Sequence, residues 1–424
     1  MQKPPPLLAG RRVIELGTML AAPFAAHILS QLGAEVIKVE PPSGDPTRSL
    51  VRGGPSGTFI AYSHGKQSVC IDLSKPEGHV AFCKLLTTAD ALVHNLSPKA
   101  ARKLKLTREH CAAVNPELIY CHIRGYGAGP LEDDLASNPV AEASTGVMEA
   151  NRVDGRPSRL GPSYHDQFAG AYAVIGILAS MLQRPPASMS QSQQASRQAQ
   201  HGNADGHVEV GLYETGLHVA SRDLVGVQLK TQLLGKPERE PHGEFSMPGY
   251  GAYQTCDERW IYLLMLSDTH WLKFCQAMEL PTDESLATLR QRKKAREKVE
   301  SLVKAAVAVH TFSAVAARLK ATGMGFTEVL PLERVLDAPQ ARHQGKLRHV
   351  QFRDFEFDVP EFPRLHGGQD DLSTQPPPNL GEHTAVVLKA AGVDQAEYEA
   401  MLGSGAIAEA TAHAFAWAPV RREA

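Results

Sequence analysis

Asp166 is the residue of this sequence whose type and setting best suit covalent chemistry. It lies at the start of an apolar segment, PSYHDQFAGAYAVIGILASMLQR (162–184), that predicts a helix. The N–H groups of a helix start keep a carboxylate ionised and oriented, which suits nucleophilic attack on an acyl group. A lone Asp just before a helix is more often an ordinary N-cap, so the residues leave both roles open. His165 is interpreted as its neighbour and not its partner, because adjacent side chains at a helix start diverge.

The chain opens with a strand–helix–strand pattern that has the outline of a dinucleotide-binding unit. RRVIEL (11–16) and EVIKVE (35–40) predict strands, and APFAAHILSQLG (22–33) predicts the helix between them. Glu40, at the end of the second strand, is placed to bond a ribose. The turn GTMLAAP, however, carries Leu20 where close approach to a pyrophosphate needs glycine. We therefore expect a Rossmann-like layer without a dinucleotide site.

A series of cations follows the predicted strand ends of this first region. They are Lys66, Lys75, Lys99, Arg102, Lys103 and Lys105. Such residues commonly belong to a solvated face. Because ligands gather at the carboxyl ends of parallel strands, the series is also placed to hold the phosphates of a bound cofactor. Both interpretations stay open on the residues alone.

The rest of the pattern predicts an α/β protein with a parallel sheet covered by helices. Further strands are expected at 67–73, 91–96 and 118–127, and a helix at 76–89. The apolar helix 162–184 is expected to be buried, with Gly170 and Gly176 used for close packing.

Two later segments differ from this pattern. PPASMSQSQQASRQAQHGNADG (185–206) is polar and of low complexity, which predicts a surface insertion without a catalytic role. Residues 246–335 have the pattern of a smaller α+β unit, with Trp260 and Trp271 expected in its core. The tail is rich in proline and then helical.

The composition excludes several classes of protein. The 424 residues are 43% hydrophobic and 21% charged, which predicts a globular protein of two compact units. A formal net charge of −2 does not favour binding to nucleic acid. Six cysteines without a C-x-x-C pair predict free thiols in a reducing compartment and no metal site. With no apolar run of membrane-spanning length and no apolar signal core, we expect a cytoplasmic protein that does not contact a membrane.

Several segments occur in an order that is typical of one family. They are RVIELGTMLAAPFAAHILSQLGAEVIKVEPPSGDPTR, GKQSVCIDLSKPEG (65–78), ADALVHNLSP (89–98), NPELIYCHIRGYGAGP (115–130), DQFAGAYAVIGILASMLQR, HVEVGLYET, WLKFCQAMEL and PLERVLDAPQ. Each is a weak indication alone, but the ordered set covers nearly the whole chain. By it the sequence resembles the class III CoA-transferase family, which includes formyl-CoA transferase and the 2-methylacyl-CoA racemases.

This resemblance implies a fold and an assembly. Family members are homodimers of two interlocked, ring-like subunits. Each subunit would have a large Rossmann-like CoA-binding domain, here 1–225 and 336–424, and a smaller α+β domain, here 226–335, inserted between its parts.

The resemblance also implies a mechanism and a set of binding residues. Asp166 would attack the acyl-CoA carbonyl to give a mixed anhydride and CoA thiolate, and the thiolate would return to give an aspartyl-CoA thioester. An acceptor carboxylate would then take over the CoA. The positions that match the family's CoA contacts are Leu73, Lys75, Asn95, Leu96, Arg102, Lys103 and Arg124. Coenzyme A thioesters would be substrates, with no permanently bound cofactor.

The departures from the family narrow the prediction. Formyl-CoA transferase has a glutamine where this chain has Leu20, so oxalate and formate are not the expected substrates. The racemases pair their Asp with a His from the segment that matches 131–146, which holds no His here. We therefore predict a CoA-transferase that moves CoA from an acyl-CoA, with succinyl-CoA as the first choice, to a carboxylic acid. The alternatives are an acyl-CoA racemase or isomerase on the same scaffold and a CoA-binding protein without turnover.

Overall fold

The chain forms two compact units, each held together by contacts among its own residues. The computed structural model describes residues 6–51, 54–183, 206–235, 247–281, 283–343, 346–363 and 375–410. The large unit takes Met1–Glu149, Ser158–Ser221 and His343–Ala424, and the small unit takes Ala150–Pro157 and Arg222–Arg342. The predicted insertion 185–206 lies outside the described residues, except for Gly206. The assignment of 1–225 with 336–424, and of 226–335, as functional domains stays a prediction.

A sheet forms the centre of the large unit, with the strand order β14-β3-β2-β1-β4-β5-β8 in the described residues. The strands are Arg12–Leu16 (β1), Glu35–Glu40 (β2), Gln67–Ile71 (β3), Ala91–His94 (β4), Ile119–Arg124 (β5), His207–Gly211 (β8) and Ile407–Ala408 (β14). Neighbours pair in parallel, except that β14 runs antiparallel to β3. The order of the parallel strands is that of a doubly wound Rossmann sheet, so the predicted α/β class is confirmed.

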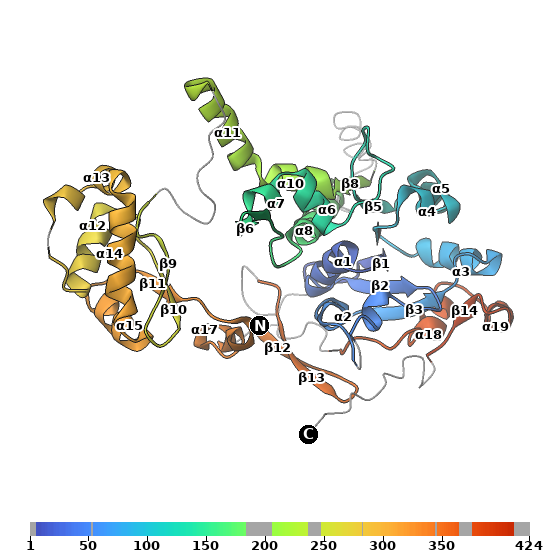
Figure 1. Cartoon of the computed structure of the whole chain (residues 1–424). Helices are drawn as coiled ribbons and strands as arrows, with labels where there is room; N and C mark the ends of the chain where they lie inside the picture. The colour runs from blue at the N-terminus through green and yellow to red at the C-terminus, as the bar shows by residue number, and fades with distance from the viewer. Residues whose placement is uncertain are drawn as a thin grey trace, which may run out of the picture. The chain divides into compact units, whose positions relative to one another are not determined.

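Two layers of helices cover this sheet (Figure 1). The helices of the large unit are Ala21–Gln31 (α1), Gly57–Ser63 (α2), Pro76–Leu86 (α3), Pro98–Lys103 (α4), Arg108–Val114 (α5), Asn138–Ser144 (α6), Val147–Ala150 (α7), Tyr164–Gln183 (α8), Leu212–Val219 (α10), Thr384–Ala390 (α18) and Gln395–Gly403 (α19), with a 3-10 turn at Pro46–Arg48. One buried cluster joins the sheet to α1 and α8, and another joins it to α3, α5, α18 and α19.

The alternation of side chains along β1 explains the two layers. Val13 packs with the α1 and α8 cluster, whereas Ile14 packs with the α3 cluster. Successive strand residues point to opposite faces, so a strand that is apolar at both positions becomes buried on both sides. The C-terminal α18 and α19 lie beside α3, at the end of the sheet formed by β3 and β14 (Figure 1).

Helix α8 is less buried than its sequence predicts. A Cβ on Gly170 would lie 2.8 Å from the Ala21 carbonyl oxygen, and one on Gly176 would lie 2.6 Å from Val208 Cγ1, so the predicted close packing is confirmed. Ile175 and Leu182, however, are 62% and 78% exposed. The prediction of a buried helix was therefore wrong for the opposite face of α8 within one chain.

The sequence did not predict a hairpin in the C-terminal part of the large unit. Leu347–Phe352 (β12) and Phe355–Pro360 (β13) pair antiparallel. Val350, Phe352 and Val359 from this hairpin pack on Phe59 and Ile60 of α2. The sequence analysis assigned no element to this segment, which precedes the proline-rich tail.

The small unit has its own core around a short antiparallel sheet, β11-β10-β9. Its elements are Arg152–Val153 (β6), Arg156–Pro157 (β7), Ser221–Leu234 (α11), Gly251–Gln254 (β9), Trp260–Leu263 (β10), Asp268–Ala277 (α12), a 3-10 turn Glu284–Leu286, Leu289–Lys294 (α13), Arg296–Ala308 (α14), Phe312–Ala321 (α15), Phe326–Glu328 (β11), Leu332–Val335 (α16) and Pro339–Arg342 (α17). Trp271 is in the core as predicted, whereas Trp260 is 44% exposed.

A search of the described residues finds no single helix with the length and apolarity needed to cross a membrane. One bent pair, α14 with α15, meets those criteria on length and composition alone.

Candidate active site

A cavity of about 430 Å³ lies at the carboxyl ends of β4 and β5, between the starts of α1, α6 and α8. This is the edge of a doubly wound sheet at which ligands bind. Its lining includes Thr18, Met19, Leu20, Ala21, Asn95, Leu96, Arg124, Asn138, Arg159 and Asp166. Asp166, the residue that the sequence singled out for covalent chemistry, therefore lies in a cavity of ligand size.

Asp166 is in the first turn of α8 and not before it, since the helix begins at Tyr164. Its predicted position just before the helix was wrong. Instead, the side-chain oxygen of Asn138 accepts hydrogen bonds from the backbone N–H groups of His165, at 2.9 Å, and of Asp166, at 3.3 Å. Asn138 thus satisfies the first donors of the helix, and the Asp166 side chain is left to face the cavity.

Burial controls the charge of Asp166. It raises the pKa of the carboxyl to about 6, against the positive charge of Arg159, which lowers the pKa, while the negative charge of Glu142 raises it further. Desolvation therefore has a larger effect on this carboxyl than the favourable setting of a helix start, although a pKa of about 6 still leaves it ionised at neutral pH. A carboxyl that titrates near neutral pH is a common property of catalytic groups.

Glu142 and Asn138 were missed by the sequence reasoning. Glu142 is fully buried; it accepts hydrogen bonds from the Asn138 side-chain amide and, at 3.1 Å, from the Leu160 backbone N–H. The bond from Leu160 ties α6 to the segment that precedes α8. The segment SNPVAE at 137–142 indicates only a helix start, because proline, here Pro139, is common in the first turn of a helix.

Three of the predicted CoA-binding residues lie in the cavity lining, namely Asn95, Leu96 and Arg124. The Asn95 side chain accepts from the Thr18 N–H and donates to the Thr18 carbonyl, both at 2.9 Å. Arg124 donates to the Glu132 carbonyl at 2.8 Å and pairs with Glu209 at 3.3 Å. Asn95 therefore holds the loop before α1, and Arg124 presents a partly buried guanidinium to the cavity.

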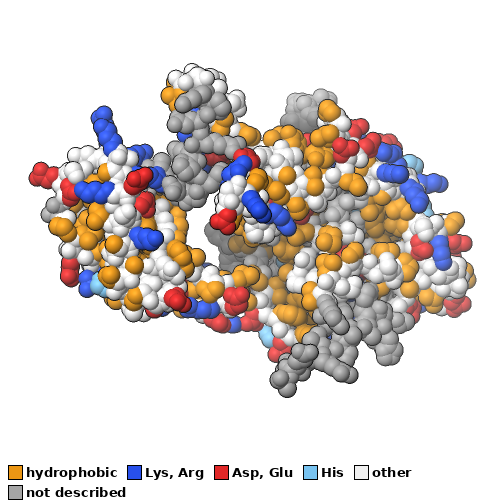
Figure 2. Space-filling view, in the orientation of Figure 1, with side chains coloured by type: hydrophobic (Ala, Val, Ile, Leu, Met, Phe, Trp, Pro, Cys, Tyr) orange, Lys and Arg blue, Asp and Glu red, His pale blue; other side chains and the backbone are white. Residues whose placement is uncertain are grey.

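The other four predicted CoA-binding residues lie outside this lining. Leu73 packs against the α3 cluster, and Lys75 Nζ donates to the Ser404 carbonyl at 2.6 Å. Arg102 pairs with Asp133 on the surface at 2.9 Å, and Lys103 is exposed. Figure 2 shows Lys and Arg side chains gathered over α4 and α5, as an exposed cationic face predicts.

Two other predicted groups prove to be structural. Lys66, from the cation series, is buried and pairs with Glu15 at 2.5 Å, so it does not belong to a surface cradle. Glu40, the possible ribose ligand, is buried and pairs with Arg48 at 2.6 Å. Both residues are therefore engaged in buried ion pairs and are not placed to bind a ligand.

His165 points away from the cavity. Its side chain is buried, with Nε2 3.3 Å from Thr145 Oγ1, and a Cβ on Gly216 would lie 2.5 Å from Nε2. Burial lowers the pKa of this imidazole. The interpretation of His165 as a neighbour of Asp166 agrees with this orientation.

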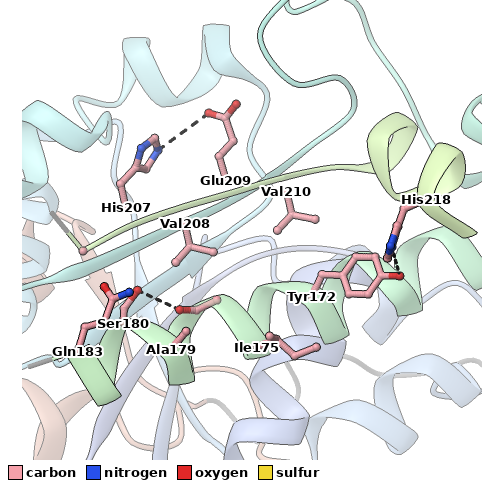
Figure 3. A pocket seen from close by; sticks show the side chains of 12 residues that line it. Tyr172, Ile175, Ala179, Ser180, Gln183, His207, Val208, Glu209, Val210 and His218 are labelled. Atoms are coloured by element: carbon pink, nitrogen blue, oxygen red, sulfur yellow. Dashed lines mark hydrogen bonds and ion pairs between the residues drawn. The ribbon is translucent and has the colours of Figure 1, made fainter. Parts of the chain in front are cut away.

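A second hollow, a groove of about 650 Å³, lies further along α8 (Figure 3). Tyr172, Ile175 and Ala179 of α8 face the edge strand β8 across it, and His218 of α10 lies at one end. The Tyr172 hydroxyl bonds His218 Nδ1 at 2.8 Å, and His207 lies 4.0 Å from Glu209. The groove thus has a greater volume than the cavity, but two of its polar side chains, Tyr172 and His218, bond each other.

Comparison with known proteins assigns this chain to a family. The model of CoA-transferase family III matches residues 8–384. The chain is 29% identical to succinyl-CoA–D-citramalate CoA-transferase of Chloroflexus aurantiacus, over 91% of this chain and 94% of that protein. It is 27% identical to succinate–glutarate CoA-transferase of Agrobacterium fabrum, over 91% and 96% respectively.

A solved structure has the same fold. The crystal structure of a CAIB/BAIF family protein from Brucella suis aligns with a TM-score of 0.77, at 24% identity over 92% of this chain and all of that one. The family model spans both compact units and every residue that lines the cavity. The chain belongs to CoA-transferase family III, and it is an enzyme that transfers coenzyme A.

Proposed function

We propose that the enzyme moves CoA from succinyl-CoA to a small dicarboxylic acid, with Asp166 as the covalent nucleophile. The observation that carries this proposal is a partly buried carboxylate with a raised pKa, at the strand-end cavity of a family III chain. The raised pKa leaves Asp166 ionised above about pH 6, so it can attack at neutral pH.

The proposed reaction has four steps. Asp166 attacks the thioester carbonyl of the donor, and CoA leaves as the thiolate, which leaves a mixed anhydride. The thiolate attacks the aspartyl carbonyl of the anhydride, which releases succinate and forms an aspartyl-CoA thioester. The acceptor carboxylate attacks this thioester to give a second anhydride and the thiolate. The thiolate then attacks the acceptor's acyl carbonyl, which gives the new acyl-CoA and free Asp166.

The cavity suits a dicarboxylate chain. Leu20 gives the lining an apolar side chain, which suits the methylene groups of succinyl, and Arg159 gives it a guanidinium, which suits the second carboxylate. Two relatives are named for succinyl-CoA or succinate together with D-citramalate or glutarate, and both of these are dicarboxylic acids.

Coenzyme A would follow the strand ends away from the cavity. Asn95, Leu96 and Arg124 line the cavity with Asp166. Leu73 and Lys75 follow the carboxyl end of β3, and Arg102 and Lys103 are in α4, which follows β4. The cations would bind phosphates, and the two leucines would pack on the adenine. No step of this scheme needs a permanently bound cofactor.

Racemization has less support. Removing and returning a proton at an α-carbon needs a base on each face of the substrate. His165 is turned toward Thr145 and Gly216, so it does not supply a second base next to Asp166.

We also infer that the enzyme is a homodimer, interlocked as in its family. Helix α11 has no buried residue in the single chain, and its Val225, Leu229 and Leu233 form an apolar stripe that is 54% to 73% exposed. A second subunit would cover such a stripe. The six free cysteines fit a reducing compartment, which is why we propose the cytoplasm.

The test is isotope exchange with succinate as the only added carboxylic acid. Wild-type enzyme is incubated with succinyl-CoA and deuterated succinate, and label in succinyl-CoA is followed by mass spectrometry. The proposed half-reaction predicts exchange by the wild type and none by Asp166→Asn. Exchange that survives in Asp166→Asn would contradict the nucleophile, and an exchange-negative wild type would contradict the donor.

A further inference from the structure

Two buried lysines donate hydrogen bonds to the two ends of segment 17–23, which borders the cavity and is called the loop below, although its last three residues begin α1. Lys38 Nζ donates to the Gly17 carbonyl and Lys66 Nζ to the Pro23 carbonyl, each at 2.9 Å. Each lysine is only 1% exposed. The residues between these two carbonyls include Thr18, Met19, Leu20 and Ala21, which line the cavity with Asp166.

A single carboxylate connects the two lysines. Glu15, on β1, is fully buried; its Oε1 lies 2.7 Å from Lys38 Nζ and its Oε2 lies 2.5 Å from Lys66 Nζ. Asp45 Oδ2 lies 2.8 Å from Lys38 Nζ. The two cations thus face two anions, and both ammonium groups keep one donor directed at the loop.

The loop needs support of this kind because its own conformation is strained. Met19 has a φ of +63°, in the left-handed region that side chains rarely adopt. At Gly17, a Cβ would lie 2.4 Å from Ala22 Cβ. The two hydrogen bonds between Asn95 and Thr18 form a third attachment. Contacts from outside the loop therefore determine its position.

The loop is also in close contact with the helix that carries Asp166. The Ala21 carbonyl lies where a Cβ on Gly170 would be only 2.8 Å away, so there is no space for the loop to move toward α8. Gly170 is one helical turn beyond Asp166 in α8. A shift of the loop would therefore change the shape of the cavity beside the Asp166 carboxylate.

We propose that Glu15, Lys38 and Lys66 are positioning residues for CoA transfer. They hold the loop 17–23 so that its cavity-facing residues meet the acyl group at Asp166, an inference that rests on the proposed function. Buried ion pairs are a poor source of stability compared with apolar side chains of the same size. Their use here is directional, because an ammonium group can be aimed at a carbonyl oxygen and an apolar group cannot.

The test compares two double variants that each remove one buried charge of each sign. Glu15→Gln/Lys66→Met leaves Lys38 paired with Asp45 but frees the Pro23 carbonyl. The matched control, Glu40→Gln/Arg48→Met, removes the adjacent buried pair, in which Arg48 donates to Glu40 and to the Pro378 carbonyl. Hydrogen exchange of peptides that cover 17–24, thermal unfolding, kcat and KM for succinyl-CoA are measured for both.

We expect similar losses of thermal stability, but a selective effect on the loop and on kcat. The first variant should lose at least about tenfold in kcat with less than about threefold change in KM, and exchange in 17–24 should rise about tenfold. The control should keep kcat and the exchange of 17–24 within about threefold of wild type. Equal losses of kcat in both variants, or an unchanged loop in the first, would overturn the proposal.

Two outcomes separate this proposal from its premise. If wild-type enzyme exchanges no succinate, the proposed donor fails, but the contrast in hydrogen exchange between the variants still tests the loop. If neither variant folds, the wild type decides, because the Thr18 N–H should be protected in its bond to Asn95. Exchange of Thr18 at the rate of an open loop would then overturn the proposal.

Discussion

The cavity at Asp166 and the groove of Figure 3 use opposite ends of the same helix, and they differ in their polar groups. In the groove, the Tyr172 hydroxyl bonds His218, and His207 lies 4.0 Å from Glu209. In the cavity, Asp166 is half-buried with a raised pKa, and the residues around it are held by buried partners such as Glu142.

The difference teaches that size is a poor guide to function. The groove has a volume of about 650 Å³ and the cavity one of about 430 Å³, yet it is the cavity that holds Asp166, whose pKa is raised by burial. A site needs a reactive group that is costly to keep charged and a surrounding structure that fixes it. The predictions below test whether activity follows the cavity and not the groove.

Loss of the Asp166 carboxylate should have the largest effect. Asp166→Ala should lower kcat by at least about a thousandfold, because the covalent route is removed. The matched change in the groove, Tyr172→Phe, removes its bond to His218 and should stay within about twofold of wild type. Steady-state kinetics with succinyl-CoA measures both. A large loss of kcat in Tyr172→Phe would break the comparison.

Removal of the Arg159 guanidinium should have the next largest effect. Arg159→Gln should lower kcat/KM for a dicarboxylate acceptor by about tenfold to a hundredfold, because a charge-assisted hydrogen bond to the second carboxylate is lost. A monocarboxylate acceptor of equal length should lose less, since it does not make that bond. Equal losses for the two acceptors would show that Arg159 does not select the second carboxylate.

The pH dependence should follow the Asp166 carboxyl. Its pKa of about 6 predicts that kcat/KM falls about tenfold per pH unit below pH 6, since protonation removes the nucleophile. Glu142→Gln removes a negative charge that raises this pKa, so the acid limb should move to lower pH. An acid limb that Glu142→Gln leaves in place, or moves upward, would assign the pKa to another group.

Stability should show the smallest effect, with a defined sign. Because the folded-state pKa of Asp166 is raised, the folded protein favours the protonated carboxyl, and wild-type stability falls as pH rises from about 4 through about 6. Asp166→Asn removes this loss, so its gain over wild type should be larger at pH 8 than at pH 4, by roughly 1–2 kcal/mol. Denaturant unfolding at the two pH values measures the gain. The groove variant Tyr172→Phe should show no such difference between the two pH values.

The sequence predicted those parts that follow from local pattern. The strands β1 to β5 and the helix that carries Asp166 are within a few residues of their expected positions, since each has a clear apolar period. Gly170 and Gly176 were expected to allow close packing, and they do. The class of fold and the family followed from the order of these segments.

The rest depended on contacts between distant segments. Nothing local in SNPVAE shows that Asn138 caps α8 or that Glu142 raises the pKa of Asp166. Lys66 resembled a surface cation, although Glu15, fifty-one residues earlier in the chain, makes its burial possible. The exposure of one face of α8 could not be predicted for a similar reason. An apolar sequence does not show which of its faces packs against the rest of the chain.

The central claim is that the Asp166 carboxylate becomes covalently linked during transfer. Its most direct test is mass spectrometry of the intact protein after brief incubation with succinyl-CoA, followed by peptide mapping and repeated with Asp166→Ala. We expect a CoA-sized adduct on the peptide that contains Asp166, which disappears when a dicarboxylate acceptor is added and is absent from the variant. Rapid CoA transfer without any adduct in the wild type, or an adduct on another residue that persists in Asp166→Ala, would contradict it.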